Sequence, residues 1–502
     1  MIISRKRGAL GFVAALILAV PLADAGTPAV AAAPADTGTP AVAAGPADSA
    51  APAVAAAPAC TAPTPSSTQP GYLVADPDCD LNGAPFVPLT DSTGAPLSSV
   101  HTGIRAGAAY RIEVPLHWNG ELVVFAHGYR GTGRTVFVDN PTLRAYYVAR
   151  GFAWAASSFA TNGYDVGQGV RDSYAMIGLF RQVTGRSASG VLMSGESMGG
   201  QVTAVTIEKH PSSFLGAMPY CGVLGDTRLF DFYLEANVTA AALAGVHIDF
   251  PLQPSADYPN LWRTQVSRIL PALGLRAGAP PNLTAAGRTW SAVLERDTGG
   301  VRPGFDSSFA FWNAVRSTAP LDDLPFLFGL YPGLTGGTEN IAVGNVAGNR
   351  FTRYRSTDRR RPTAAERRLN AQVLRVRRTA TADPGLSGVP RVDGRPPVPV
   401  LSLHDIGDLF VPFSMEQAYA QRAAANHRSR LFVSRAIRGV GHCDFTQPEL
   451  RTAFDDLVNW VRTGQRPGGD AILDRRAVAD PAFGCRYTVG VRAAFVAPAC
   501  PG

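Results

Sequence analysis

Ser197 stands where nucleophilic chemistry is possible, in Gly195-Glu-Ser-Met-Gly199, after the apolar run 190–194 and before the helical stretch 199–209. A serine in so sharp a turn from strand to helix is held in strained backbone geometry, and the flanking glycines let strand and helix pass closely. We expect its hydroxyl at the carboxyl edge of a sheet, with the N–H of Met198 directed toward negative charge that develops there.

A base and an acid of suitable type follow later in the chain. A serine hydroxyl is a poor nucleophile at neutral pH, so a neutral imidazole must take its proton, and a carboxylate must hold that imidazole in the correct tautomer. His442, in Gly439-Val-Gly-His-Cys443, is expected as the base, and Asp408, in the loop 404–412, as the acid. The chain order Ser, Asp, His agrees with one particular fold.

An oxyanion that forms at a carbonyl carbon needs two N–H donors. Tyr129, in His127-Gly-Tyr129 after the apolar run 121–126, stands where a second backbone donor is supplied, and Met198 supplies the first. His127 and Glu196 adjoin these donors, so we expect both at the pocket wall.

The elements that must position these side chains alternate between compact apolar runs and helical stretches. Continuous apolar runs between helices indicate a parallel sheet covered on both faces. The runs lie at 121–126, 152–157, 190–194, 214–220, 398–403 and 430–434, and the helical stretches at 169–184, 199–209 and 447–462. We expect a mostly parallel central sheet with helices on both faces, formed by residues 69–225 and 395–467.

Residues 226–394 differ in character. Helix-like segments at 227–243, 261–273, 282–296 and 364–378 are separated by Gly/Pro-rich turns. We expect a helical cap inserted into the sheet domain. Its Arg-rich stretch, Arg353–Arg378, either binds an anionic substrate or is a solvated helix face, and charge runs are more often the latter.

These motifs resemble the α/β-hydrolase superfamily, and the resemblance covers about residues 115–225 and 396–465. It implies the α/β-hydrolase fold, with Ser197 at the nucleophile elbow, Asp408 as the acid and His442 as the base. It also implies that the backbone N–H groups of Tyr129 and Met198 form the oxyanion hole.

One position departs from the family pattern. Asp405 stands where a glycine usually follows the loop histidine, which makes Asp405 a rival acid. The ending Val411-Pro412 fixes the register of the loop and favours Asp408. His404 lies at the strand end beside the acid, where sheets of this kind form the ligand crevice, so it is a further pocket candidate.

Six cysteines, an even number, suit an oxidising compartment. No Cys/His cluster has zinc-ligand spacing, so disulfides are expected in place of a metal, although sequence alone does not choose the pairing. Cys221 ends a strand and Cys443 follows the active histidine, so both should lie at one sheet edge. The hypothesis is Cys221–Cys443, with local pairs Cys60–Cys79 and Cys485–Cys500. Secreted tannase and feruloyl esterase enzymes look similar, with a cysteine after the histidine; their second cysteine adjoins the serine, where this chain has Glu196.

The two ends of the chain carry their own signals. Residues 1–25 combine basic Arg5–Arg7, an apolar run shorter than the ~20 residues of a membrane span, and Ala-Asp-Ala before Gly26. This pattern predicts a secretory signal peptide, export, and no stable membrane insertion after cleavage. Residues 26–68, rich in Ala and Pro, are expected to be a disordered linker, and residues 468–502 a disulfide-closed tail.

Composition excludes some functions. With 46% hydrophobic and 17% charged residues, the chain can bury a substantial core. The net charge of +7 becomes +5 when the signal peptide takes three positive charges and Asp24 with it. This imbalance is too weak to indicate a nucleic-acid or membrane partner.

The function expected from these observations is a secreted serine hydrolase that cleaves small or polymeric carboxylic esters through an acyl-enzyme, without metal or organic cofactor. One alternative is a serine exopeptidase of the same fold, because caps inserted at this point also occur in exopeptidases. Another is a non-catalytic cell-surface binding protein that kept the fold and uses the Pro/Ala segment as a tether. Nothing in the sequence specifies an oligomer.

Overall fold

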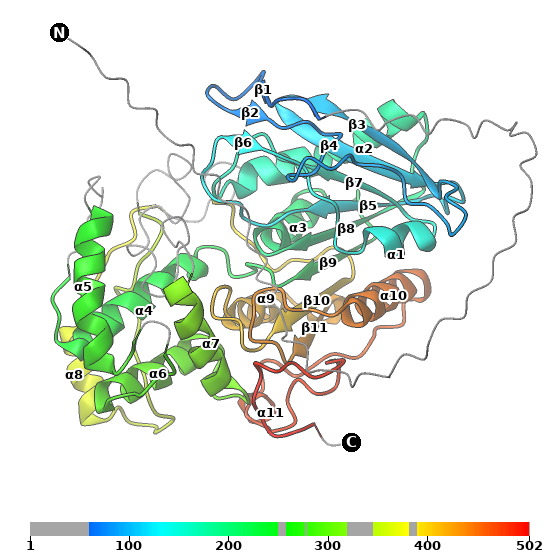
Figure 1. Cartoon of the computed structure of the whole chain (residues 1–502). Helices are drawn as coiled ribbons and strands as arrows, with labels where there is room; N and C mark the ends of the chain where they lie inside the picture. The colour runs from blue at the N-terminus through cyan, green and yellow to red at the C-terminus, as the bar shows by residue number, and fades with distance from the viewer. Residues whose placement is uncertain (1–59, 249–257, 277–278, 319–344, 381–388, 501–502) are drawn as a thin grey trace, which may run out of the picture. The chain divides into compact units, whose positions relative to one another are not determined.

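The computed structural model describes residues 60–248, 258–276, 279–318, 345–380 and 389–500 (Figure 1). The predicted signal peptide and residues 26–59 of the predicted linker lie outside the described residues. The end of that linker is folded, which corrects its expected boundary at residue 68. There β1 (Thr64–Pro65) pairs with β2 (Leu73–Val74), and the N–H of Thr61 donates to Asp76 at 2.7 Å.

An eight-stranded sheet forms the centre of the described chain, in the order β11-β10-β9-β8-β5-β7-β4-β3. Its strands are β3 (Ser98–Arg105), β4 (Ala108–Pro115), β5 (Glu121–Ala126), β7 (Ala153–Ser157), β8 (Gly190–Glu196), β9 (Gly216–Tyr220), β10 (Val400–Asp405) and β11 (Phe432–Ile437). β4 alone runs opposite to the other seven strands, and it pairs antiparallel with β3 and with β7. A smaller sheet pairs β2 with β1 and with β6 (Thr135–Val136).

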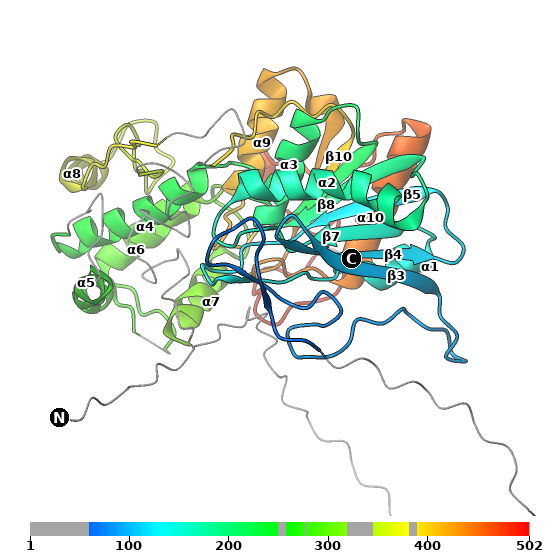
Figure 2. The same ribbon diagram turned by 90° about the horizontal axis from the view of Figure 1, so that it is seen from above.

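Helices cover both faces of the large sheet (Figure 2). One face carries α2 (Val166–Thr184), α3 (Met198–Lys209) and α9 (Ser414–Ala425), and the other carries α1 (Arg144–Ala149) and α10 (Gln447–Thr463). β9 and β10 are buried along their whole length, which suits their mostly apolar side chains. The polar side chains of β10, Ser402, His404 and Asp405, make hydrogen bonds inside the fold. The expected mostly parallel sheet with helices on both faces is therefore confirmed.

Helix α10 shows how the sequence fixes such a layer. Thr446 and Glu449 form a capping box at its start, and Gly464 ends it in the left-handed conformation. Apolar side chains at helical spacing are buried against the sheet, namely Leu450, Phe454 and Leu457. The capping box fixes the start of α10 at Thr446. Only a short loop therefore separates His442 from the start of this helix.

Between β9 and β10 the chain forms further helices: α4 (Arg228–Ala244), α5 (Tyr258–Leu273), α6 (Ala285–Asp297), α7 (Phe305–Thr318) and α8 (Ala364–Gln372). In Figure 1 they gather beside the sheet, and α4 packs against α5, α6 and α8. Helix α7 was not among the expected segments. Helix α8 ends at Gln372, before the expected residue 378, because the N–H of Val376 donates to Asn349 Oδ1 at 2.7 Å and not within a helix.

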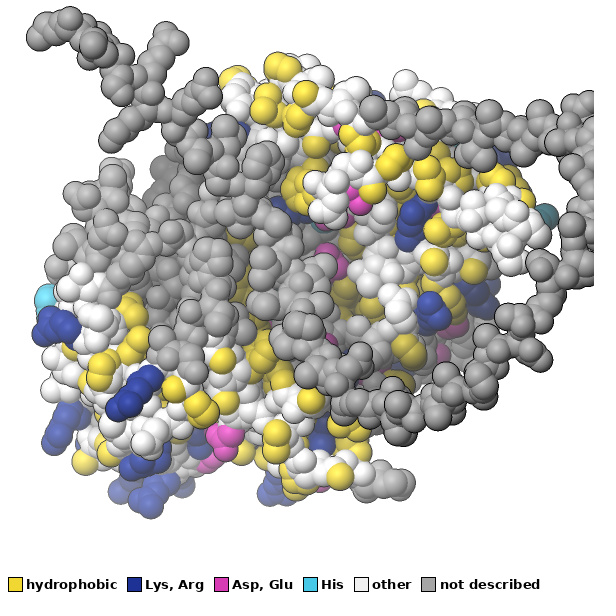
Figure 3. All heavy atoms as spheres, viewed as in Figure 1, with side chains coloured by type: hydrophobic (Ala, Val, Ile, Leu, Met, Phe, Trp, Pro, Cys, Tyr) yellow, Lys and Arg dark blue, Asp and Glu magenta, His cyan; other side chains and the backbone are white. Residues whose placement is uncertain are grey.

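The Arg-rich stretch divides into bonded and exposed members. Arg378 forms an ion pair with Asp231, and Arg375 donates to the carbonyl oxygens of Asn349 and Thr352. Arg359, Arg360 and Arg361 are exposed. Figure 3 shows basic side chains over the region of α6 and α8.

The C-terminal segment contains α11 (Arg475–Val478) and returns to the sheet. Arg438, which directly follows β11, donates to Phe483 O at 2.9 Å and to Pro498 O at 2.7 Å. Among the helices of the described chain, none combines the length and the apolar character that a membrane span requires.

Candidate active site

Ser197 lies in the turn between β8 and α3, with φ +56° and ψ −122°. A non-glycine residue at positive φ is strained, and the surrounding packing must hold it there. The packing comes from glycines: a Cβ on Gly199 would collide with the backbone oxygen of Ala126, and one on Gly195 with the backbone of Gly199. The strand and helix therefore approach as the sequence predicts, and the hydroxyl emerges at the carboxyl edge of the sheet.

The structure brings Ser197, His442 and Asp408 together from three separate parts of the chain. Ser197 Oγ lies 2.8 Å from His442 Nε2, and His442 Nδ1 lies 2.6 Å from Asp408 Oδ2. An ionised carboxylate can only accept, so the proton belongs on Nδ1, and Nε2 is left to accept from the serine hydroxyl. This is the tautomer required of a general base.

Asp408 is fully buried, and its second oxygen is also occupied. Oδ1 accepts the N–H groups of Phe410 at 2.8 Å and Val411 at 3.0 Å. These bonds orient the carboxylate toward His442. The Val411-Pro412 ending thus belongs to the turn that holds the acid.

Asp405, the rival acid, is bonded on the other side of the histidine loop. Its Oδ2 accepts the N–H of Asp444 at 2.8 Å, and its Oδ1 is packed against Gly439. Burial, with the nearby carboxylates of Asp444 and Asp408, raises the pKa of Asp405 well above its usual value, which favours the neutral acid. A neutral carboxyl cannot stabilise an imidazolium as a carboxylate does.

The two expected oxyanion donors flank the serine. Met198 is the first residue of α3, where N–H groups of the first turn have no partner within the helix. On the other side a Cβ on Gly128 would lie 3.1 Å from Ser197 Cβ, so the loop that leads to Tyr129 runs directly against the serine. Both donors thus belong to segments that pack around Ser197.

His127 is buried beneath this loop. Its Nδ1 lies 2.7 Å from Gly128 O, its Nε2 lies 3.0 Å from Ser158 O, and its ring stacks on Phe159 with centroids 4.0 Å apart. Burial and the charge of Arg130 lower the pKa of His127 well below its usual value. A neutral imidazole donates from one nitrogen only, so the ring bonds one of these two carbonyl oxygens and packs beside the other beneath the loop that leads to Tyr129.

Glu196, next to the nucleophile, faces a polar cluster. Its Oε2 accepts from the hydroxyl of Tyr220 at 3.2 Å and from that of Thr142 at 3.4 Å. Burial and the Asp139 carboxylate raise the pKa of Glu196. The side chain therefore links the nucleophile turn to the segment before α1.

His404 lies in the interior, which corrects the expectation of a pocket wall. It is fully buried, and its Nε2 lies 2.8 Å from Val411 O. Burial acts to lower the pKa of His404, but Glu416, 3.7 Å from Nδ1, acts with the Asp408 carboxylate and the Val411 carbonyl in the opposite direction, and the pKa is raised. The ring supports the acid turn from behind because β10 directs it into the packed layer under α9.

Three disulfides are present: Cys60–Cys79, Cys221–Cys443 and Cys485–Cys500, the same pairs as in the hypothesis from the sequence. Cys221 follows β9, and Cys443 follows His442, so the second bridge ties the histidine loop to the sheet. Among the described residues, the one Cys/His/acid group with metal-ligand spacing is Cys221, His442 and Cys443. Its cysteines are oxidised and offer no thiolate.

The sequence did not point to two aromatic side chains beside the acid and histidine loops, Phe410 and Tyr233. The ring of Phe410 meets that of His442 edge to face, with centroids 5.0 Å apart. Tyr233 of α4 donates its hydroxyl to Phe410 O at 2.7 Å. Phe410 stands two residues after Asp408, and this proximity was the only sequence signal that could have placed it near the site. Nothing in the sequence pairs it with Tyr233.

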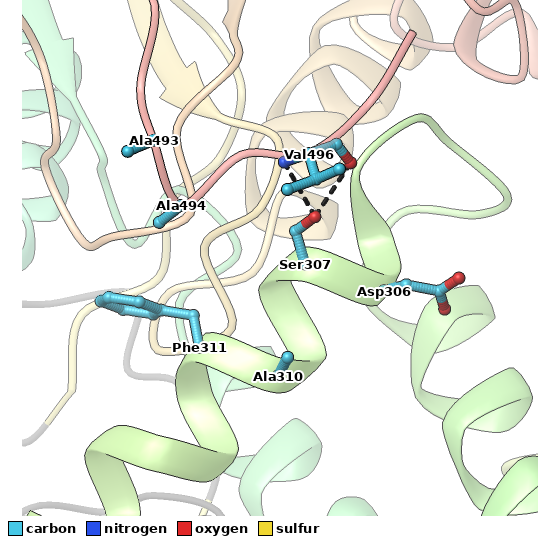
Figure 4. A pocket seen from close by; sticks show the side chains of 7 residues that line it. All are labelled: Asp306, Ser307, Ala310, Phe311, Ala493, Ala494 and Val496. Atoms are coloured by element: carbon cyan, nitrogen blue, oxygen red, sulfur yellow. Dashed lines mark hydrogen bonds between the residues drawn. The ribbon is translucent and has the colours of Figure 1, made fainter. Parts of the chain in front are cut away.

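A hollow of about 620 Å³ lies elsewhere, between α7 and the C-terminal segment (Figure 4). Ser307 bridges the two sides, with its Oγ 2.9 Å from both the N and the O of Val496. Phe311 and the alanines 310, 493 and 494 provide an apolar lining. None of the expected site residues belongs to this lining.

The mostly parallel sheet, the helices on both faces and the serine at positive φ between β8 and α3 define the α/β-hydrolase fold. The expected resemblance to the α/β-hydrolase superfamily is thereby confirmed.

Comparisons with known proteins add the following. An o-phthalyl amidase from Xanthobacter agilis is 33% identical over 106 residues, which are 21% of this chain and 22% of that protein. Feruloyl esterase B from Aspergillus oryzae matches 76% of this chain and 86% of its own, with 14% identity and a TM-score of 0.43. The match to tannin acyl hydrolase from Aspergillus niger covers 74% of this chain and 78% of that chain, with 14% identity and a TM-score of 0.39. No family model matches. These likenesses are too low or too short to transfer a substrate.

Proposed function

We propose that the chain is a serine hydrolase that cleaves carboxylic esters through an acyl-enzyme, with Ser197, His442 and Asp408 as its catalytic triad. The observation that carries this proposal is the continuous hydrogen-bond chain from Ser197 Oγ through the imidazole to Asp408 Oδ2, at 2.8 and 2.6 Å. Residues of these types and this tautomer perform acyl transfer on several unrelated folds.

The reaction proceeds in two halves. His442 Nε2 takes the hydroxyl proton as Ser197 Oγ attacks the ester carbonyl carbon, and the carbonyl oxygen becomes an oxyanion. The N–H groups of Met198 and Tyr129 stabilise this charge, and loss of one such donor typically costs ~3 kcal/mol. His442 then gives its proton to the departing alkoxide, leaving the acyl group on Ser197. Water then attacks the acyl carbonyl carbon as His442 takes its proton, and His442 passes that proton to Ser197 Oγ when the bond to the acyl carbon breaks, which releases the carboxylic acid and the free serine.

Active-site labelling tests the proposal directly. A fluorophosphonate should label Ser197 in the purified wild-type protein, and short nitrophenyl esters should be hydrolysed. The Ser197→Ala variant should show neither, while circular dichroism confirms its fold. Failure of Ser197 to react, or equal turnover by S197A, would refute the assignment and favour a non-catalytic binding protein.

Amide cleavage is a second candidate, which the partial match to an amidase favours. Peptide anilides and simple aryl amides, tested beside esters of the same acyl group, separate the candidates. A higher kcat/KM on peptide anilides would point to the exopeptidase alternative, and one on simple amides to an amidase.

Secretion is part of the same proposal. The signal-like residues 1–25 and the three disulfides support it, because disulfides persist in oxidising compartments. Expression of the full chain should release protein that begins near Gly26 into the medium or the periplasm. N-terminal sequencing of that protein checks the cleavage site.

A further inference from the structure

Trp312, on helix α7, reaches both loops that carry the acid and the base. Its indole Nε1 donates to Val440 O at 2.8 Å and, more weakly, to Gly407 O at 3.2 Å. Val440 stands two residues before His442, and Gly407 stands one residue before Asp408. One buried indole N–H from the inserted helices therefore bonds to two backbone carbonyl oxygens, one just before the acid and one just before the base in the chain.

Gly407 shows how closely α7 is fitted against these loops. A Cβ at this position would collide with Ser308 Oγ of α7 and would lie 2.5 Å from Gly439 O. The N–H of Gly407 donates to the same Gly439 O at 2.9 Å. The acid loop is thus enclosed between α7 on one side and the histidine loop on the other.

The ring of Trp312 makes a second connection. It stacks on Phe410 with centroids 6.2 Å apart and an interplanar angle of 20°. Phe410 in turn meets the imidazole of His442 at 5.0 Å, edge to face. Displacement of the indole would therefore reach His442 through its neighbouring ring as well as through the backbone.

Other side chains before β10 support the same loop. Arg302 Nε donates to Ile406 O at 2.5 Å, and the Tyr233 hydroxyl donates to Phe410 O at 2.7 Å. With Trp312 they bond the carbonyl oxygens on both sides of Asp408. The acid turn has bonds of its own, from the N–H groups of Phe410 and Val411 to Asp408 Oδ1, and the donors from the inserted helices add partners for its carbonyl oxygens.

We propose that Trp312 is a positioning residue of the hydrolase: its indole N–H holds the acid loop and the histidine loop at the spacing that lets Asp408 orient His442. This inference rests on the proposed function. Misplacement of reacting groups by about 1 Å can cost ~100-fold in rate, so a donor that sets this spacing affects turnover without touching substrate.

Trp312→Phe is the test, and Trp290→Phe is its matched control. Trp290, on α6, is also buried, and it donates its Nε1 to Ala236 O at 2.9 Å, away from the acid and histidine loops. Each substitution removes an indole N–H and keeps an aromatic ring. We expect W312F to lower kcat on a nitrophenyl ester ~10-fold or more with little change in KM. W290F should keep kcat within about twofold, and both variants should unfold at similarly reduced urea concentrations.

The pH profile separates positioning from general weakening. An imidazolium that is less well paired with Asp408 is less stable, so the acidic limb of kcat/KM in W312F should move to lower pH. W290F should keep the wild-type limb. An equal loss of kcat in both variants, with unchanged limbs, would overturn the proposal and leave Trp312 as ordinary packing.

A proton NMR measurement keeps the inference testable even if no ester is hydrolysed. The Nδ1 proton of His442 in a short bond to a carboxylate should give a far-downfield signal, assigned by its absence in Asp408→Asn. W312F should weaken or shift this signal, and W290F should not. An unperturbed signal in W312F would refute the role of Trp312, whereas an inactive wild type with the expected signal change would refute only the proposed function.

Discussion

The nucleophile turn and the acid and histidine loops reach the same site by different means. Ser197 is fixed from within the sheet domain, where Gly195 and Gly199 let β8, α3 and the end of β5 pack backbone to backbone. Asp408 and His442 are fixed from outside, by indole, guanidinium and phenol donors and by the Cys221–Cys443 bridge. Close backbone packing thus places Ser197, whereas hydrogen bonds from the inserted helices and a disulfide place Asp408 and His442.

The largest effect is expected from the acid. Asp408→Asn cannot stabilise the imidazolium and favours the wrong tautomer, so kcat should fall by ~10⁴-fold with little loss of fold. Steady-state kinetics on a nitrophenyl ester measures this. Asp405→Asn replaces a carboxyl whose raised pKa already favours the neutral form, so its kcat should stay within about threefold. Similar losses in the two variants would mean that both carboxyls act in the site.

The next largest effect is expected from removal of the Cys221–Cys443 disulfide, which ties the histidine loop to the sheet. Cys221→Ser with Cys443→Ser opens a bridge of sequence separation 222, so the free energy of unfolding should fall by about 4 kcal/mol. Since the bridge adjoins His442, kcat should fall too in the fraction that remains folded. Urea unfolding and kinetics of Cys60→Ser with Cys79→Ser provide the control, which should lose stability and keep kcat.

A smaller effect is expected from a substitution in the nucleophile turn, and it should be a loss of folding stability. Gly199→Ala places a Cβ against the backbone oxygens of Ala126 and His127, which cannot rotate away, so stability should fall by about 3 kcal/mol. Thermal and urea unfolding measure it. Gly178→Ala, in α2, meets nothing within 4 Å and should be neutral or slightly stabilising. If G199A folded normally and lost only kcat, the turn would not depend on packing as described.

The smallest effect is a pH dependence of stability at the other end of α3. Burial raises the pKa of Glu208 to about 7, although its carboxylate accepts the N–H groups of Arg395 and Asp393. A carboxyl that binds its proton more tightly when folded makes the protein most stable below its unfolded pKa, near 4.5.

The free energy of unfolding should accordingly decrease by on the order of 1–2 kcal/mol as the pH rises from 4.5 to about 7. Urea unfolding across this range checks the slope, and Glu208→Gln should flatten it. A Glu208→Gln profile parallel to that of the wild type would assign the dependence to other groups.

The sequence predicted the parts of the site that depend on neighbouring residues in the chain, namely the turn at Ser197 and the choice of Asp408. Gly195-Glu-Ser-Met-Gly199 specifies a turn because glycine alone tolerates such approach, and Val411-Pro412 indicated which aspartate faces the histidine. Trp312 and Arg302 could not be found in this way. Their partners are backbone carbonyl oxygens far along the chain, which leave no trace in the sequence of either segment.

The strands β3 and β4 escaped prediction for a related reason. Arg111 and Glu113 lie in β4 and interrupt its apolar pattern, although both are buried. Glu113 forms an ion pair with Arg144 at 2.6 Å and accepts from Trp154 Nε1 at 2.9 Å. Buried charges of this kind are stable only with such partners, and the partners are assembled by the fold.

Gly407 has a consequence for engineering. Gly407 is enclosed between Ser308 of the inserted helix α7 and the backbone of Gly439, so the inserted helices are closely fitted to the sheet domain at this point. A chimera that exchanged residues 226–394 for a foreign lid would leave the carbonyl oxygens of Ile406, Gly407 and Val440 without their present donors. Transplants that retain the α7 indole should therefore tolerate new substrate walls better than transplants that discard it.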